Sequence, residues 1–235
     1  MKTYKTSLIL IFLLLGISPW AFSALPGMSS KHLRLVKDLM NNNLAYSQDA
    51  TTTNIIEWEE EIVDSLRQKK DYRNMFLMRQ MAVYAYSLQA KISEALKKAD
   101  AMMDEARLMK YNIGISLSYQ ALGDIYLNAG MRPEAVEEYE KAMKTLQATP
   151  HAEKIQERIF IQLVPTLIKL KRMDEAKAYL EHMSEICESK CLSPFLLYAY
   201  HAYYYLRNND LSKAREYIDE AIKINNRTPS HFYDN

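Results

Sequence analysis

The sequence predicts an all-α fold, a right-handed superhelical solenoid of antiparallel helix pairs, with about ten helices in five pairs. Two observations lead to this prediction. Turn-forming residues are scarce, with 5 Gly and 7 Pro among 235 residues, and no stretch alternates polar and apolar residues as a strand does. In addition, four turn-plus-helix segments align on a small residue that opens the second helix, at spacings of 40, 41 and 38 residues. The four small residues are Ala95, Ala135, Ala176 and Ala214.

An alanine at this position has a packing explanation. The two helices of a pair approach each other closely there, and a larger side chain would force them apart. One helix pair cannot bury its apolar face alone, so repeated pairs are expected to stack on one another. Such a stack offers an extended surface, and the sequence therefore predicts binding in preference to catalysis.

The first residues have the composition of a secretory signal peptide. Lys2 and Lys5 form a basic start, residues 7–17 are apolar, and small residues follow Pro19. The apolar stretch is shorter than the roughly 20 residues that a helix needs to cross a bilayer. We therefore expect residues 1–23 to be removed after Ser23, which leaves a periplasmic or secreted chain without this segment. An uncleaved N-terminal anchor is the alternative.

The mature chain, residues 24–235, is expected to begin with a degenerate capping pair at about 30–70. Its helices are predicted at 30–47 and 54–69, without the alanine, and Thr53 or Asn54 can act as N-cap of the second. Four fuller repeats follow at about 72–110, 112–149, 151–190 and 194–226. Their helices are expected at 72–88 and 92–109, 113–128 and 132–146, 152–170 and 173–186, and 194–207 and 211–224.

Pro165 lies inside one of the predicted first helices, 152–170. A proline there lacks the N–H that would bond to the carbonyl four residues earlier, and its ring crowds that carbonyl. We therefore expect the helix to kink, or to break near Ile161.

Composition and motifs give no support for catalysis, a cofactor or a metal. The formal net charge is +1, which favours neither nucleic acid nor anionic membrane as a partner. Five histidines are scattered without HExxH spacing, and there is neither a glycine-rich phosphate loop nor a nucleophile elbow. A helical hydrolase or lyase that acts on glycans remains an alternative without a motif.

Cys187 and Cys191 are the only cysteines. An even cysteine count in an exported chain indicates a disulfide, and the i, i+4 spacing places the two Cα atoms about 6 Å apart on a helix. We predict a structural Cys187–Cys191 disulfide, with two reduced thiols as the alternative.

One segment carries a family motif. It reads Tyr119-x-x-Leu122-Gly123-x-x-Tyr126, followed by Ala135-x-x-x-Tyr139-x-x-Ala142. The segment resembles a tetratricopeptide repeat in which Tyr119 replaces the usual Trp, and the resemblance extends over about 155 residues, 72–226. It implies that the first helices line a concave groove that receives a peptide or an extended segment of a partner protein.

The resemblance also implies which residues face the groove. In the first aligned repeat these are Gln80, Tyr84 and Ser87, and in the second Gln120, Asp124 and Asn128; the third gives Arg158, Ile161 and Lys169, and the fourth Ala199, Tyr203 and Arg207. The surface is mixed polar and aromatic, with basic residues toward its C-terminal end. Tyr198 and Tyr205 align with residues that pack between helices, so only Tyr203 of this aromatic helix is expected at the groove.

The sequence departs from one subclass of this family and is similar to another. Gln80 and Tyr84 stand where repeats that clamp the carboxyl-terminal tail of heat-shock chaperones have Lys and Asn, so that function is not expected. Residues 110–126 are similar to extracytoplasmic tetratricopeptide domains of bacterial sensor proteins. The alternative function is therefore the N-terminal sensor portion of a membrane-bound signalling protein. Thr228 and Pro229 look like another helix start, which fits either a longer protein or a short docked tail.

Overall fold

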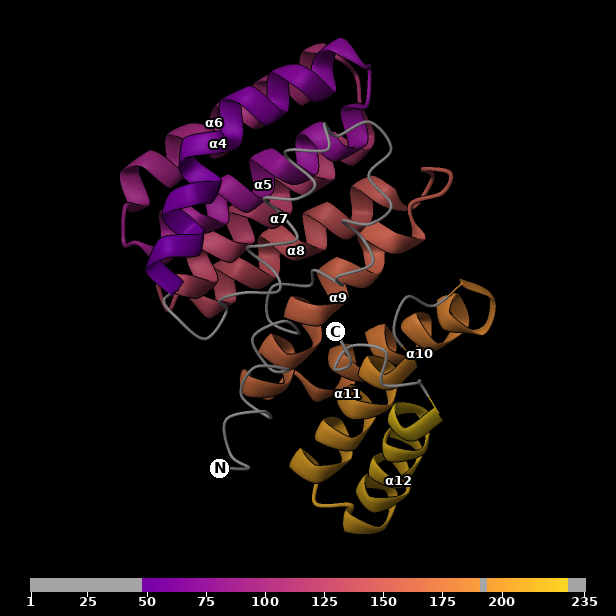
Figure 1. Ribbon diagram of the computed structural model, residues 1–235. Coiled ribbons are helices and arrows are strands. Elements are labelled where there is room, and N and C mark those ends of the chain that lie inside the picture. The colour runs from indigo at the N-terminus through magenta and orange to yellow at the C-terminus, as the bar shows by residue number, and fades with distance from the viewer. Residues whose placement is uncertain (1–47, 191–193, 228–235) are drawn as a thin grey trace. The chain divides into compact units, whose positions relative to one another are not determined.

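The computed structural model describes residues 48–190 and 194–227, and within these ranges it contains nine α-helices and no strand (Figure 1). The predicted all-α fold is thus confirmed. The chain forms two compact units, residues 1–152 and 153–235. The first contains α4 (Gln48–Gln68), α5 (Tyr72–Leu88), α6 (Ile92–Leu108), α7 (Asn112–Asn128) and α8 (Arg132–Leu146). The second contains α9 (Glu153–Lys169), α10 (Met173–Lys190), α11 (Pro194–Arg207) and α12 (Leu211–Arg227).

Helices α5 to α12 begin and end within a few residues of the predicted bounds, and α5 matches them. Helix α4 differs because it begins at Gln48. Thr53 and Asn54 thus lie inside α4, and the prediction that one of them caps it is wrong. Polar and β-branched residues cost well under about 1 kcal/mol each inside a helix, which is too little to end one. The signal peptide and the helix at 30–47 fall outside the described ranges, and a continuous solenoid through all pairs stays a prediction.

The turns between helices share one backbone conformation, in which one residue has a positive φ. In the turn after α5, Ala90 has a φ of 57°, the Ala90 N–H donates to the Ser87 carbonyl, and the Lys91 N–H donates to the Tyr86 carbonyl. This pattern satisfies the last carbonyls of the helix and reverses the chain. Gly130 has the corresponding place after α7, with a φ of 82°. Non-glycine residues take the left-handed conformation at the other turns: Lys70, Ala90, Lys110, His151, Lys171 and Asn209.

The glycine of the repeat motif is required by close packing. A Cβ atom added to Gly123 would lie 2.5 Å from Cε1 of Tyr139, whose ring is completely buried. Tyr139 of α8 therefore packs directly on the backbone of α7. The alanines that open α6 and α8, Ala95 and Ala135, are also fully buried, as the alignment predicted.

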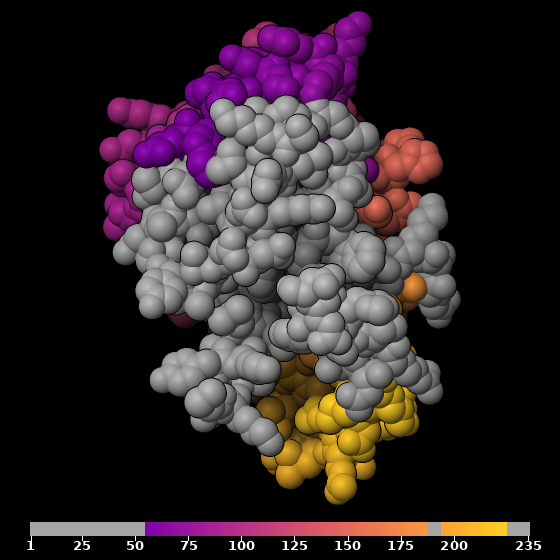
Figure 2. All heavy atoms as spheres, in the orientation of Figure 1, coloured from indigo at the N-terminus to yellow at the C-terminus, as the bar shows by residue number. Residues whose placement is uncertain are grey.

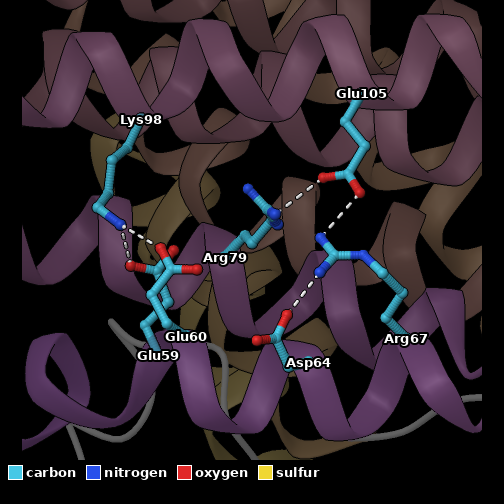
Figure 3. A network of polar contacts seen from close by, with 7 residues as sticks. All are labelled: Glu59, Glu60, Asp64, Arg67, Arg79, Lys98 and Glu105. Carbon is cyan, nitrogen blue, oxygen red and sulfur yellow. Dashed lines mark hydrogen bonds and ion pairs between the residues drawn. The ribbon is translucent and has the colours of Figure 1, made fainter.

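Charged side chains connect α4, α5 and α6 within the first unit (Figure 3). Lys98 of α6 bonds to Glu59 and lies 3.2 Å from Glu60, both on α4. Farther along the same helices, Glu105 of α6 accepts from Arg67 of α4 at 3.0 Å and from Arg79 of α5 at 2.9 Å. Glu59 is almost completely buried, so this pairing is part of the packing of the unit.

Helix α9 is continuous through Pro165, so the predicted break near Ile161 is absent. The Ile161 carbonyl, which loses its usual N–H partner to the proline, accepts a hydrogen bond from the Tyr200 hydroxyl at 3.1 Å. Tyr200 belongs to α11, so a side chain of the next first helix replaces the missing backbone donor. Burial raises the pKa of Tyr200, which keeps the hydroxyl protonated as a donor.

Candidate binding surface on the first helices

The first helices of the first unit, α5 and α7, lie side by side and are joined by polar side chains. The Gln80 amide of α5 donates to Oδ2 of Asp124 on α7 at 2.7 Å. Two turns along α5, Ser87 Oγ accepts from the Asn128 amide of α7, also at 2.7 Å. Four of the residues predicted at the groove thus form two side-chain hydrogen bonds between the neighbouring first helices α5 and α7.

Asp124 is the centre of a buried polar cluster. Its other oxygen, Oδ1, accepts from the Tyr139 hydroxyl of α8 at 2.7 Å. Asp124 is 3% exposed, Gln80 4% and Tyr139 0%. Burial and the Asp124 carboxylate raise the pKa of Tyr139 well above its usual value, and the same two causes raise the pKa of Tyr84 to about 12. Both phenols therefore stay neutral, and Asp124 holds three helices in register as a shared acceptor.

The predicted groove residues of the first unit differ in accessibility. Gln120 lies one turn before Asp124, is buried, and its Oε1 has no hydrogen-bond partner in the structure. Gln80 and Asp124 are buried as well, whereas Tyr84 is half-buried and Asn128 is exposed. The structure thus places these residues on adjoining helices, and direct contact with a partner stays a prediction for each of them.

In the second unit, the predicted residues lie on α9 and α11, the two helices joined by Tyr200 and Ile161. Lys169 and Arg207 are exposed at the ends of their helices, and Arg158 and Tyr203 are half-buried. Three of these four side chains are cationic. The predicted groove residues that are accessible on these two helices thus comprise three cations and one aromatic ring.

Tyr198 and Tyr205 of α11 pack against α12, as expected for residues between helices. The rings of Tyr198 and Tyr205 lie 6.0 and 5.4 Å from that of Tyr217. His201 stacks on the same ring at 4.6 Å, and its Nε2 lies 3.1 Å from Ser184 Oγ of α10. Burial lowers the pKa of His201, although the charge of Glu181 acts in the opposite direction.

Sequence reasoning missed two residues. Tyr139 was recognised as part of the repeat motif but not as the donor to Asp124, because the pairing requires α7 and α8 to be placed in space. Tyr200 was missed although a signal existed. The proline at 165 leaves the Ile161 carbonyl without a donor, and a nearby hydroxyl could have been sought on the next first helix.

No cluster of three or more potential metal ligands occurs in the parts of the chain that the structure describes. Cys187 lies near the end of α10, and Cys191 falls outside the described residues, so the disulfide stays a prediction. Within the same ranges, no helix is both long and apolar enough to cross a membrane. The sensor alternative likewise stays a prediction.

The family model described as tetratricopeptide repeat matches residues 117–145 and 197–228. The first match covers most of α7 and α8, including Gly123 and Tyr139, whose packing explains the motif. Tetratricopeptide repeats thus occur at these two places in the chain. Such repeats are typically interaction modules that present extended surfaces. The second match covers most of α11 and α12, so the repeat occurs in both units.

The fold of this chain is similar to the crystal structure of BtubC (BKLC) from P. vanneervenii. The TM-score is 0.57 at 13% sequence identity, over 86% of this chain and 91% of that chain. At this identity the likeness concerns the fold alone. No curated protein sequence matches the chain.

Proposed function

We propose that this protein is an exported, non-catalytic interaction module whose first-helix surface binds an extended segment of a partner protein. The repeat family supports an interaction role. The observation that carries the proposal is the accessible surface of α9 and α11, where Lys169, Arg207, Arg158 and Tyr203 lie on neighbouring first helices.

The chemistry of this surface indicates the kind of segment that it binds. Arginine forms bidentate hydrogen bonds with carboxylates, and tyrosine contributes a rigid ring with a polar tip, a combination common at binding hot spots. The Tyr200 bond to the Ile161 carbonyl holds the two helices together, so the side chains are presented on a fixed frame. We therefore expect a partner segment that carries carboxylates.

A pull-down from the native envelope fraction tests the proposal. Three baits are compared. They are the wild-type chain, the double variant Tyr203→Ala with Arg207→Ala, and a control double variant with Lys177→Ala and Glu181→Ala. The control residues are exposed on α10, a second helix. We expect the double variant to capture at least about tenfold less of the main partner, as for loss of a hot-spot pair. Equal capture by wild type and the double variant contradicts this surface.

Export is tested separately. When the complete gene is expressed in its native host, the exported protein should begin at Ala24, as read by mass spectrometry of its N-terminal peptide. Ala21→Arg should block processing, because the position three residues before the cut requires a small side chain. A chain that retains residues 1–23 contradicts cleavage.

A further inference from the structure

Helix α12 has an apolar strip that faces solvent. Ile218 is 45% exposed, Ile222 51% and Leu211 63%. These positions are separated by seven and four residues, so they lie on one face of the helix. Ala214 and Ala221, which flank the strip at the next positions around the helix, are buried. Part of α12 reaches the molecular surface in Figure 2, where it is yellow.

The same repeat position is buried in every earlier pair. Four residues after the opening alanine stand Ala99, Tyr139 and Leu180, all at most 1% exposed. In α12 that place is taken by Ile218. A β-branched apolar residue, half exposed at a position that is otherwise buried, is typical of a surface that another element covers.

The next repeat position shows what kind of element covers it. Eight residues after the opening alanine of α10 stands Ser184, which is contacted by His201 of the following helix, α11. The corresponding residue of α12 is Ile222. A helix packed along α12 is therefore the natural complement of the strip, as in the pairs before it.

Charge complementarity identifies that helix. Arg215 and Asp219 follow one edge of the strip, one turn apart, and neither forms an ion pair within residues 48–190 and 194–227. When two copies of α12 pack antiparallel about a two-fold axis near residue 217, the edge of one copy faces the same edge of the other. Arg215 then lies opposite the second copy's Asp219, and the reverse pair forms by symmetry.

The same arrangement pairs the apolar side chains. Leu211 of one copy falls near Ile222 of the other, and the two copies of Ile218 meet close to the axis. A single antiparallel register thus satisfies both the apolar strip and the charged edge. We infer that α12 is a self-association surface, through which two copies of this chain pack α12 against α12 in an antiparallel, isologous dimer.

Sedimentation of the purified chain tests the inference. Interfaces under about 1,200 Å² are usually weak, so the chain is measured at concentrations up to about 1 mM. We expect a monomer–dimer equilibrium, and we expect Ile218→Glu to raise the dissociation constant at least about tenfold. Ser93→Glu places the same charge at the corresponding exposed position of α6, outside α12, and should leave the equilibrium unchanged. Circular dichroism checks that each variant is folded. A wild-type chain that stays monomeric overturns the inference, as does dimerisation that is unaffected by Ile218→Glu.

Charge reversal tests the register itself. Arg215→Asp places two acidic residues on the edge, and Asp219→Arg places two basic ones, so each variant alone should dimerise about tenfold more weakly. Mixed together, the two variants are complementary at both pairs and should form a heterodimer within about threefold of wild-type affinity. If each variant dimerised weakly only because its own α12 had lost an Arg215–Asp219 pair, mixing the two variants would not restore the affinity. Absence of the heterodimer overturns the antiparallel register.

Discussion

The hydroxyl of Tyr200 has a structural role, although Tyr200 is not part of the repeat motif. It donates to the Ile161 carbonyl, the group that Pro165 deprives of a backbone partner, so α9 continues through the proline. A buried carbonyl left without a donor costs about 1–3 kcal/mol. One hydroxyl thus allows a proline to remain inside a helix.

Tyr200→Phe removes the hydroxyl and keeps the ring. We expect the free energy of unfolding to fall by about 1–2 kcal/mol, as measured by urea denaturation. In a Pro165→Ala background, residue 165 has an N–H for the Ile161 carbonyl, so the same change should cost less than half as much. An equal loss in both backgrounds would show that the hydroxyl acts elsewhere.

The ion pair between Glu59 and Lys98 joins two helices, α4 and α6. Burial raises the pKa of Glu59, although the bond and charge from Lys98 oppose that shift. For Lys98, burial alone would lower the pKa, but the bond and charge from Glu59 outweigh it and the pKa is raised. The pair therefore helps α4 and α6 to stay together while a carboxylate is buried.

Lys98→Met should leave the Glu59 carboxylate buried without its cation. We expect a loss of about 2 kcal/mol at pH 7, which is below the roughly 3–5 kcal/mol of a fully buried broken pair because Lys98 is partly exposed. A raised pKa means that the folded state binds the proton more tightly, so protonation of Glu59 favours folding. The loss should therefore shrink as the pH falls from 7 toward 4.

Lys97→Met, at the exposed neighbouring position, is the matched control and should change stability by less than about 0.5 kcal/mol. A loss in Lys98→Met that is the same at pH 7 and pH 4 would mean that the methylene stem, rather than the charge, stabilises the pair of helices.

His201 connects α10, α11 and α12, because it contacts Ser184 and stacks on Tyr217. Its pKa is lowered in the folded state, so the protonated form favours the unfolded chain. The corresponding stability is present above the ordinary pKa of 6.5 and is lost as the pH falls through the lower folded value. We expect the thermal midpoint of the second unit to fall on acidification below pH 6.5.

His201→Phe keeps a ring against Tyr217 and should remove this part of the pH dependence in a series of melting curves. His182→Gln, at an exposed position on α10, is the control and should retain it. If both variants lose the same pH dependence, another group in the unit is responsible.

At the scale of the whole molecule, stability is expected to vary along the chain. In stacked helix pairs each helix is held by its neighbours, so a helix with few packed neighbours opens more readily than one with several. Helix α7 lies among α5, α6 and α8 and is largely buried, whereas α12 packs against α11 and exposes two isoleucines.

Amide hydrogen exchange should therefore show protection of α7 that exceeds protection of α12. The measurement uses mass spectrometry at a low chain concentration, and Ile218→Glu, which should dimerise at least about tenfold more weakly, is the control for self-association. Equal protection of the two helices would instead indicate that the chain opens as one cooperative body.

The sequence by itself determined the all-α class, the bounds of most helices and the repeat family. These follow from local information: the scarcity of glycine and proline, the 3.6-residue periodicity, and the small residues Ala95, Ala135 and Gly123 where helices approach closely. The groove-facing positions, among them Gln80 and Asp124, came from the repeat register and stay predictions.

Only the tertiary structure decided which polar groups meet and how far each is buried. Asp124 could be assigned to a face, but its bonds to Gln80 and Tyr139 depend on the packing of three helices. Of the two outcomes expected from Pro165, a kink or a break near Ile161, the break is absent for the same reason, since the donor to the Ile161 carbonyl comes from residue 200. Hydrogen bonds and burial depend on distances between residues far apart in the chain, and local pattern fixes only the face on which each residue stands.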